Sequence, residues 1–136
     1  MARVAVPGGV VAYRRELRRR GGIYSAAGAA IVALVGAVLI VLPGQLTGLV
    51  GFGLVIAACP LLVAFGVPLV VSVGSVGIGV LASLALWFVV GQWAARRATQ
   101  RPIADWRDWW SVLWPLAIAV ALGGMTGFVL FALSVL

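Results

Sequence analysis

The chain has 136 residues, of which 64 % are apolar and only 10 % are charged, and its net charge is +7. Soluble domains are typically about 45–50 % apolar and about 25 % charged, and they cover their surface with polar groups. This composition excludes a soluble fold and predicts an all-α integral membrane protein. In such a protein, arginines beside the membrane spans contact anionic lipid headgroups, so the basic charge does not indicate a nucleic-acid partner.

The ionisable residues exclude most catalytic and cofactor-binding functions. The sequence has no histidine, and Cys59 is its only cysteine. It therefore lacks the commonest metal ligand and cannot form a zinc cluster, an iron–sulfur site or an intrachain disulfide. We expect no cofactor and no metal. An interfacial enzyme would have to rely on Asp105 and Asp108, so we expect that the protein is not an enzyme.

The first segment, residues 1–22, is rich in arginine and is predicted to be a cytoplasmic amphipathic segment. Val10, Tyr13 and Leu17 share one face of a helix by their spacing, while arginines occupy the rest. We expect this short helix to lie on the membrane surface. The arginines expected to contact lipid phosphates are Arg14, Arg15, Arg18, Arg19 and Arg20.

Residues 23–93 are expected to form three transmembrane helices. A span takes about 20 residues to cross about 30 Å of hydrocarbon, and no charged residue occurs between Arg20 and Arg96. Proline and glycine mark turns at residues 42–45 and near 66–68. Pro60 is expected to kink the second of these spans. The predicted spans are 23–42, 46–65 and 68–92.

Residues 94–111 are charged and rich in tryptophan, and they are expected to form an interfacial loop or helix. Pro102 suits the first turn of a helix, and Asp105 would then lie near the positive end of that helix. The arginines expected to contact lipid here are Arg96, Arg97 and Arg101. The fourth transmembrane helix follows at about 112–134, within the last segment, 112–136, with Pro115 near its start.

Tryptophans are expected to mark the membrane–water boundary, where the indole ring is buried and its N–H is hydrated. Four of them repeat at helical spacing and line one side of a helix: Trp106, Trp109, Trp110 and Trp114. Trp87 and Trp93, near the end of the preceding span, are expected to lie in the same aromatic belt.

The positions of the two basic segments conflict with the span count. The arginine-rich start predicts a cytoplasmic N-terminus, and three spans later the 94–110 loop would lie on the opposite side, against the positive-inside bias. A re-entrant segment over 46–66 would bring both segments to the cytoplasm, but irregular backbone at membrane depth is tolerated only where protein covers it. We rank four spans first because the N-terminal cluster has more arginines; the side of the loop stays open.

Small residues recur at helical spacing in every predicted span. Because lipid provides no hydrophobic force between helices, small residues let backbones approach and gain van der Waals contact. We predict four transmembrane helices packed through small-residue seams, with faces left over for other chains. The glycines predicted to pack helices are Gly44, Gly48, Gly51, Gly53, Gly74, Gly77, Gly79, Gly123 and Gly127. Hydroxyl groups within the spans, such as those of Ser25 and Ser83, are expected to bond to carbonyls of their own helix.

These features predict a non-catalytic accessory subunit of a larger membrane complex, with other integral membrane subunits as partners. All ten basic residues are arginine, which is typical of a GC-rich bacterial genome, so we expect the bacterial cytoplasmic membrane. The alternative is a homo-oligomeric carrier or pore for an apolar or lipid-linked substrate, with the tryptophan stripe at its mouth.

Overall fold

The computed structural model describes residues 9–66 and 72–136, and within these ranges the protein is all-helical, without a strand. Its helices are α1 (Gly9–Val41), α2 (Gln45–Ala58), α3 (Leu61–Ala64), α4 (Val73–Ala98) and α5 (Trp106–Val135). α1, α4 and α5 are long and apolar enough to cross a membrane, as expected of a multi-pass membrane protein. The start of the predicted segment 1–22 and the predicted turn and span start at 67–71 lie outside the described residues.

The basic start of the chain is not a separate surface helix. α1 continues without interruption from Gly9 through the arginines to Val41. Leu17, expected on a face lying against lipid, is instead fully buried against Ala94, Ala95 and Ala98 of α4. The apolar face of this segment thus packs on protein, and this contact keeps the segment in line with the rest of α1.

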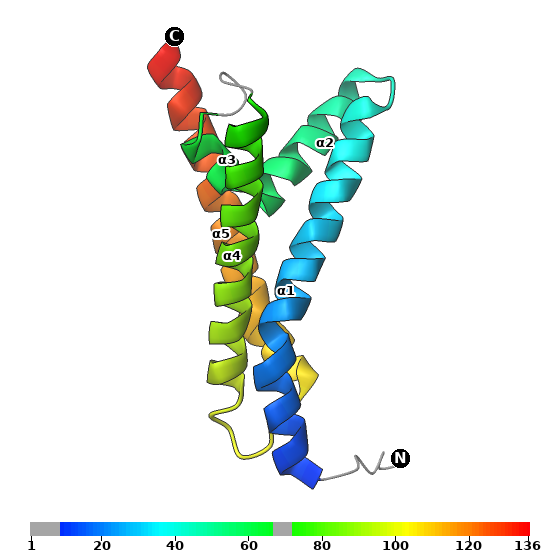
Figure 1. Ribbon diagram of the computed structural model, residues 1–136, viewed down its shortest axis with the longest axis vertical. Coiled ribbons are helices and arrows are strands. Elements are labelled where there is room, and N and C mark those ends of the chain that lie inside the picture. The colour runs from blue at the N-terminus through cyan, green and yellow to red at the C-terminus, as the bar shows by residue number, and fades with distance from the viewer. Residues whose placement is uncertain (1–8, 67–71) are drawn as a thin grey trace.

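Glycines bring α1 and α4 into close contact just beyond this point. A Cβ atom on Gly21 would lie 2.7 Å from the Cβ of Ala95, and one on Gly91 would lie 2.7 Å from the Gly21 carbonyl oxygen. Any larger residue would force the backbones apart. From this crossing the two helices diverge towards the other end of the molecule, where α2 and α3 lie beside them (Figure 1).

The predicted second span, 46–65, is divided into two helices. α2 ends at Ala58, and α3 begins after Pro60. Proline has no backbone N–H, and it disfavours helical geometry in the residue before it, so Cys59 takes φ −125° and ψ 64° and ends the helix. The fourteen residues of α2 reach only about 21 Å, less than the hydrocarbon thickness of about 30 Å.

Two side chains of α4 bind the backbone groups freed by this break. The Trp87 indole Nε1 donates to the Ala58 carbonyl at 2.6 Å, and the Leu61 amide donates to the Ser83 hydroxyl at 3.3 Å. Ala58 and Cys59 are themselves almost fully buried. Two backbone groups at the break are therefore paired, and the break is covered by protein, which is the condition for irregular backbone at membrane depth.

α2 and α3 both lie in the half of the molecule farthest from the N-terminus (Figure 1). A Cβ on Gly51 of α2 would lie 2.6 Å from the Gly36 carbonyl oxygen of α1, and Leu62 of α3 packs on Gly79 of α4. The turn between α1 and α2 falls at Pro43 and Gly44, as predicted. The four-span count is not confirmed, because α2 and α3 are each shorter than a span.

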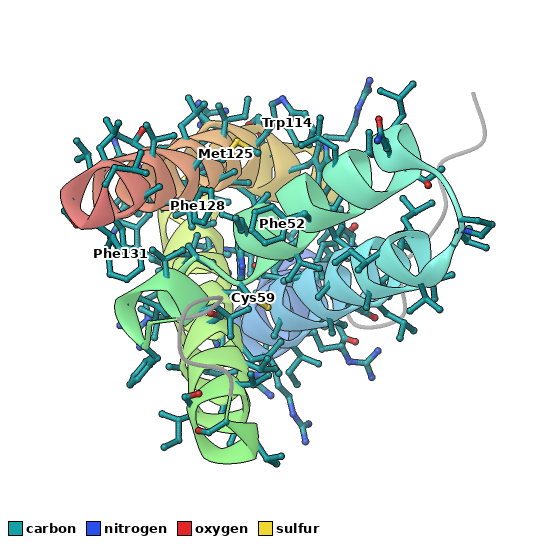
Figure 2. All side chains as sticks on the ribbon, turned by 90° about the horizontal axis from the view of Figure 1, so that it is seen from above. Phe52, Cys59, Trp114, Met125, Phe128 and Phe131 are labelled. Carbon is teal, nitrogen blue, oxygen red and sulfur yellow. The ribbon has the colours of Figure 1, made fainter. Side chains whose placement is uncertain are left out.

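α5 completes the fold and is longer than the predicted fourth span. It begins at Trp106 with a capping box, in which Asp105 accepts from backbone N–H groups of the first turn and Asp108 accepts from the Asp105 amide. Pro115 therefore lies inside the helix and not near its start. Farther along α5, the Phe128 ring packs edge-on against Phe52 of α2, with ring centroids 5.2 Å apart (Figure 2).

We predict that Trp87→Phe destabilises the protein, because the substitution leaves the buried Ala58 carbonyl without a donor. The expected loss in the free energy of unfolding is about 1–3 kcal/mol. Trp93→Phe, on the exposed side of the same helix, should cost at most about 0.5–1 kcal/mol, the value of an exposed cation–π contact. SDS titration in mixed micelles, followed by far-ultraviolet circular dichroism, measures both. Equal losses would contradict the role given to Trp87.

Candidate functional site

The two basic segments lie together at one end of the molecule, here called the charged end. Arg14 of α1 donates to the Thr99 carbonyl, and Arg18 Nε donates to the Thr99 hydroxyl at 2.9 Å. The Tyr13 hydroxyl donates to Asp105 at 3.3 Å. The predicted four-span arrangement separates these segments by the membrane. These direct contacts bring them to the same end.

The charged end carries a large excess of positive charge. In the described part of the chain only two ion pairs form, Arg20 with Glu16 and Arg101 with Asp108. Arg97 stacks over the Trp93 ring at 5.1 Å. The arginines expected to contact lipid all belong to this end: Arg14, Arg15, Arg18, Arg19 and Arg20 on α1, Arg96 and Arg97 on the last turn of α4, and Arg101 in the loop. This surface is electrostatically suited to anionic headgroups.

All three acidic residues make local contacts at the charged end. Glu16 pairs with Arg20 along α1 at 2.9 Å, and Asp108 pairs with Arg101 at 3.0 Å. Asp105 caps α5 and accepts from Tyr13. Asp105 and Asp108 therefore hold the start of α5 and the 99–105 loop, whereas Glu16 pairs only within α1.

The tryptophan stripe occupies the first turns of α5, and its members face different surroundings. Trp109 is buried and donates to the Gly91 carbonyl at 3.2 Å, which ties α5 to the α1–α4 crossing. Trp106 meets Tyr24 of α1 edge-on at 5.2 Å. Trp110 and Trp114 stack on each other at 5.7 Å, and each is more than half exposed. Only this outer pair has the exposure expected of a belt.

A groove runs between α1 and α5, with a volume of about 380 Å³. We call it the α1–α5 groove. We call the end beside Tyr24 and Trp110, which is the end nearest the charged residues, the mouth of the groove; Trp87 of α4 and Ala57 of α2 also line the groove. Its other walls include Tyr24, Ser25, Ala29 and Val32 of α1, and Trp110, Trp114, Ala117 and Ala121 of α5.

Ser25, which follows Tyr24 on α1, is a polar residue of the groove lining. Its side chain is 94 % buried, and its hydroxyl has no hydrogen-bond partner within the described residues. Other hydroxyls in the long helices bond to their own helix as predicted, for example Ser83 to the Gly79 carbonyl at 2.8 Å and Thr126 to the Leu122 carbonyl at 2.8 Å. A buried hydroxyl without a partner costs about 1–3 kcal/mol of stability.

The nine glycines predicted to pack helices fall into separate groups. Gly51 and Gly79 are buried at helix contacts, Gly53 faces Met125 of α5 at 3.9 Å, and Gly44 forms the turn with φ +138°. A Cβ on Gly74 would meet only the Ser72 hydroxyl, at 3.9 Å. The remaining four would meet nothing within 4 Å, and we call them the open glycines: Gly48, Gly77, Gly123 and Gly127.

The sequence analysis did not anticipate the roles of Trp87, Thr99 and Ser25. Trp87 was expected in the aromatic belt, but it is buried and binds the break between α2 and α3. Thr99 is fully buried and accepts from two arginines. The partners of Trp87 and Thr99 lie far away in sequence, and neither of these two residues belongs to a motif that would have indicated the contacts.

No protein-family model, curated protein or solved structure matches this chain. The residues and their geometry alone therefore carry the functional argument.

We predict that Thr99→Val destabilises the charged end, because Arg18 loses a buried hydrogen-bond acceptor. Hydrogen bonds to charged groups contribute about 1.5–3 kcal/mol, which is the expected loss in the free energy of unfolding. Glu16→Gln breaks only an exposed pair within one helix and should cost about 0.5 kcal/mol or less. Chemical unfolding in micelles compares the two; a larger loss for Glu16→Gln would contradict the importance of the Thr99 contacts.

Proposed function

We propose that this chain is a non-catalytic accessory subunit of a larger bacterial membrane complex. The open glycines are the observation that supports this proposal. Four glycines expose helix backbone on the surface of the chain, where they make no internal contact. In lipid, close backbone approach through small residues is a main source of helix–helix attraction. The proposed role of these positions is to receive helices of other integral membrane subunits.

The strongest candidate for the docking face lies between α3 and α5. A hollow of about 400 Å³ there is bordered by Pro60 and Val63 on one side and by Gly123, Gly124 and Gly127 on the other. Gly124 already packs on Pro60, where an added Cβ would lie 2.7 Å from the proline Cβ. Gly123 and Gly127 continue the same face of α5 outwards and are free to receive a further helix.

We also propose a topology of three spans, α1, α4 and α5, with α2 and α3 forming a re-entrant segment. Two observations support this arrangement: the break at Pro60, and the contacts that join the two basic segments. All described charged residues then lie at one end, and the positive-inside bias places that end in the cytoplasm. The opposite end carries no charged residue in the sequence.

Cysteine labelling in whole cells tests this topology. In a Cys59→Ser background, Val11→Cys and Gln100→Cys probe the charged end, and Gln45→Cys probes the opposite end; all three positions are exposed. With three spans, an impermeant maleimide labels Gln45→Cys in intact cells, and it labels the other two only after permeabilisation. Labelling of Gln100→Cys in intact cells together with protection of Val11→Cys would instead support four spans.

Native mass spectrometry of the tagged chain, extracted gently from its own membranes, tests the accessory role. We expect a fixed stoichiometry with larger, unrelated membrane subunits. Gly123→Leu with Gly127→Leu should abolish this association while circular dichroism of the isolated chain stays unchanged. Val129→Phe adds bulk to an exposed position on another face of α5, outside both hollows, and serves as the control. A regular homo-oligomer without other subunits would contradict the proposal and favour the carrier or pore.

A further inference from the structure

The α1–α5 groove has the length of one lipid leaflet. Its lining runs from Tyr24 to Val32 on α1 and from Trp109 to Ala121 on α5, which corresponds to about 12 Å and about 18 Å along the two helix axes. Half of the hydrocarbon core measures about 15 Å. The groove therefore extends from the level of the interfacial tryptophans to the middle of the bilayer.

The walls of the groove suit a hydrocarbon chain. Beyond Ser25 they are built from aliphatic, alanine and tryptophan side chains. The indole N–H groups of the two buried tryptophans, Trp87 and Trp109, already donate to the Ala58 and Gly91 carbonyls. Water at this depth would find few partners, and an empty groove would forfeit dispersion contacts along its whole length. The surrounding bilayer supplies a molecule of the right shape.

Polar groups follow one another at the mouth in the order found along a phospholipid. Arg20 lies one helical turn before Tyr24 on α1, about 6 Å nearer the charged end. Ser25 is the next residue after Tyr24 and lies at the start of the apolar walls. Its hydroxyl is buried and unpartnered within the described residues, so the side chain must turn towards the groove to reach a ligand there. A phosphate near Arg20 would place the ester groups of a glycerolipid near Ser25 and its chain in the groove.

We propose that the α1–α5 groove binds one acyl chain of an anionic glycerophospholipid. The phosphate is held by Arg20 and the surrounding positive charge, an ester carbonyl accepts from the Ser25 hydroxyl, and the acyl chain lies along Ala29, Ala117 and Ala121. This lipid site is separate from the glycine face offered to protein partners, because the α5 residues that line the groove end at Ala121, before Gly123.

Native mass spectrometry of the delipidated full chain, titrated with phosphatidylglycerol, tests the proposal. We expect one tightly bound lipid, with phosphatidylcholine binding about tenfold more weakly, a difference of about 1.4 kcal/mol. Ala117→Leu with Ala121→Leu fills the groove and should weaken phosphatidylglycerol binding by about tenfold or more. Ala119→Leu adds a leucine to an exposed position on the other side of α5 and should leave the affinity unchanged.

Ser25→Ala separates a binding role of the hydroxyl from a structural one. The variant should bind phosphatidylglycerol several-fold more weakly, yet the lipid-free protein should be more stable, because an unsatisfied buried hydroxyl has been removed. A loss of stability without a change in affinity would assign Ser25 a structural role and overturn its place in the site.

Phosphatidylglycerol with brominated acyl chains provides a second test on the unmodified protein. Brominated phosphatidylglycerol in the groove should quench tryptophan fluorescence more strongly than brominated phosphatidylcholine does. Replacing Trp110 and Trp114 by Phe should reduce the difference, because Trp87 and Trp109 also line the groove. Equal quenching by both lipids, or equal binding by the groove-filling and Ala119 variants, would overturn the proposal. A polyprenyl phosphate that displaces phosphatidylglycerol with tenfold higher affinity would overturn the choice of occupant.

Discussion

The fold depends on pairing the backbone groups that Pro60 frees in an apolar region of the chain. A broken helix surrounded by lipid would leave a carbonyl and an amide without partners, at a cost of several kcal/mol each. Trp87 and Ser83 of α4 supply the missing donor and acceptor. Because both belong to one helix, they also hold α3 against α4 and so fix the direction in which the chain returns.

This return determines the distribution of charge. Because α2 and α3 remain in the uncharged half, α4 runs back towards the N-terminal arginines, and the 99–105 loop meets α1 (Figure 1). The same geometry creates the α1–α5 groove. α1 is held to α4 at Gly21 and Gly91 and leans away beyond the crossing, so it touches α5 only slightly and leaves an apolar space between them.

Small residues serve two purposes in this protein. Gly21, Gly91 and Gly51 allow contacts so close that a single methyl group would collide with a neighbouring helix. Gly123 and Gly127 have the same spacing in sequence as a packing motif but face outwards. Sequence alone does not distinguish glycines at internal helix contacts from outward-facing glycines. Spacing indicates on which face of its helix a glycine lies, but it does not indicate what packs against that face. We propose that the outward-facing glycines of α5 receive another subunit.

The sequence by itself determined the properties that depend on composition and on neighbouring residues. The apolar runs predicted helices long enough for a membrane, and Pro43 and Gly44 predicted a turn. Only the tertiary structure decided how the predicted second span ends, where Leu17 packs and why Trp87 is buried. The Ala58 and Leu61 backbone groups find their partners 29 and 22 residues away. Whether a proline ends, kinks or is tolerated in an apolar helix is therefore settled by residues distant in sequence, which no local pattern encodes.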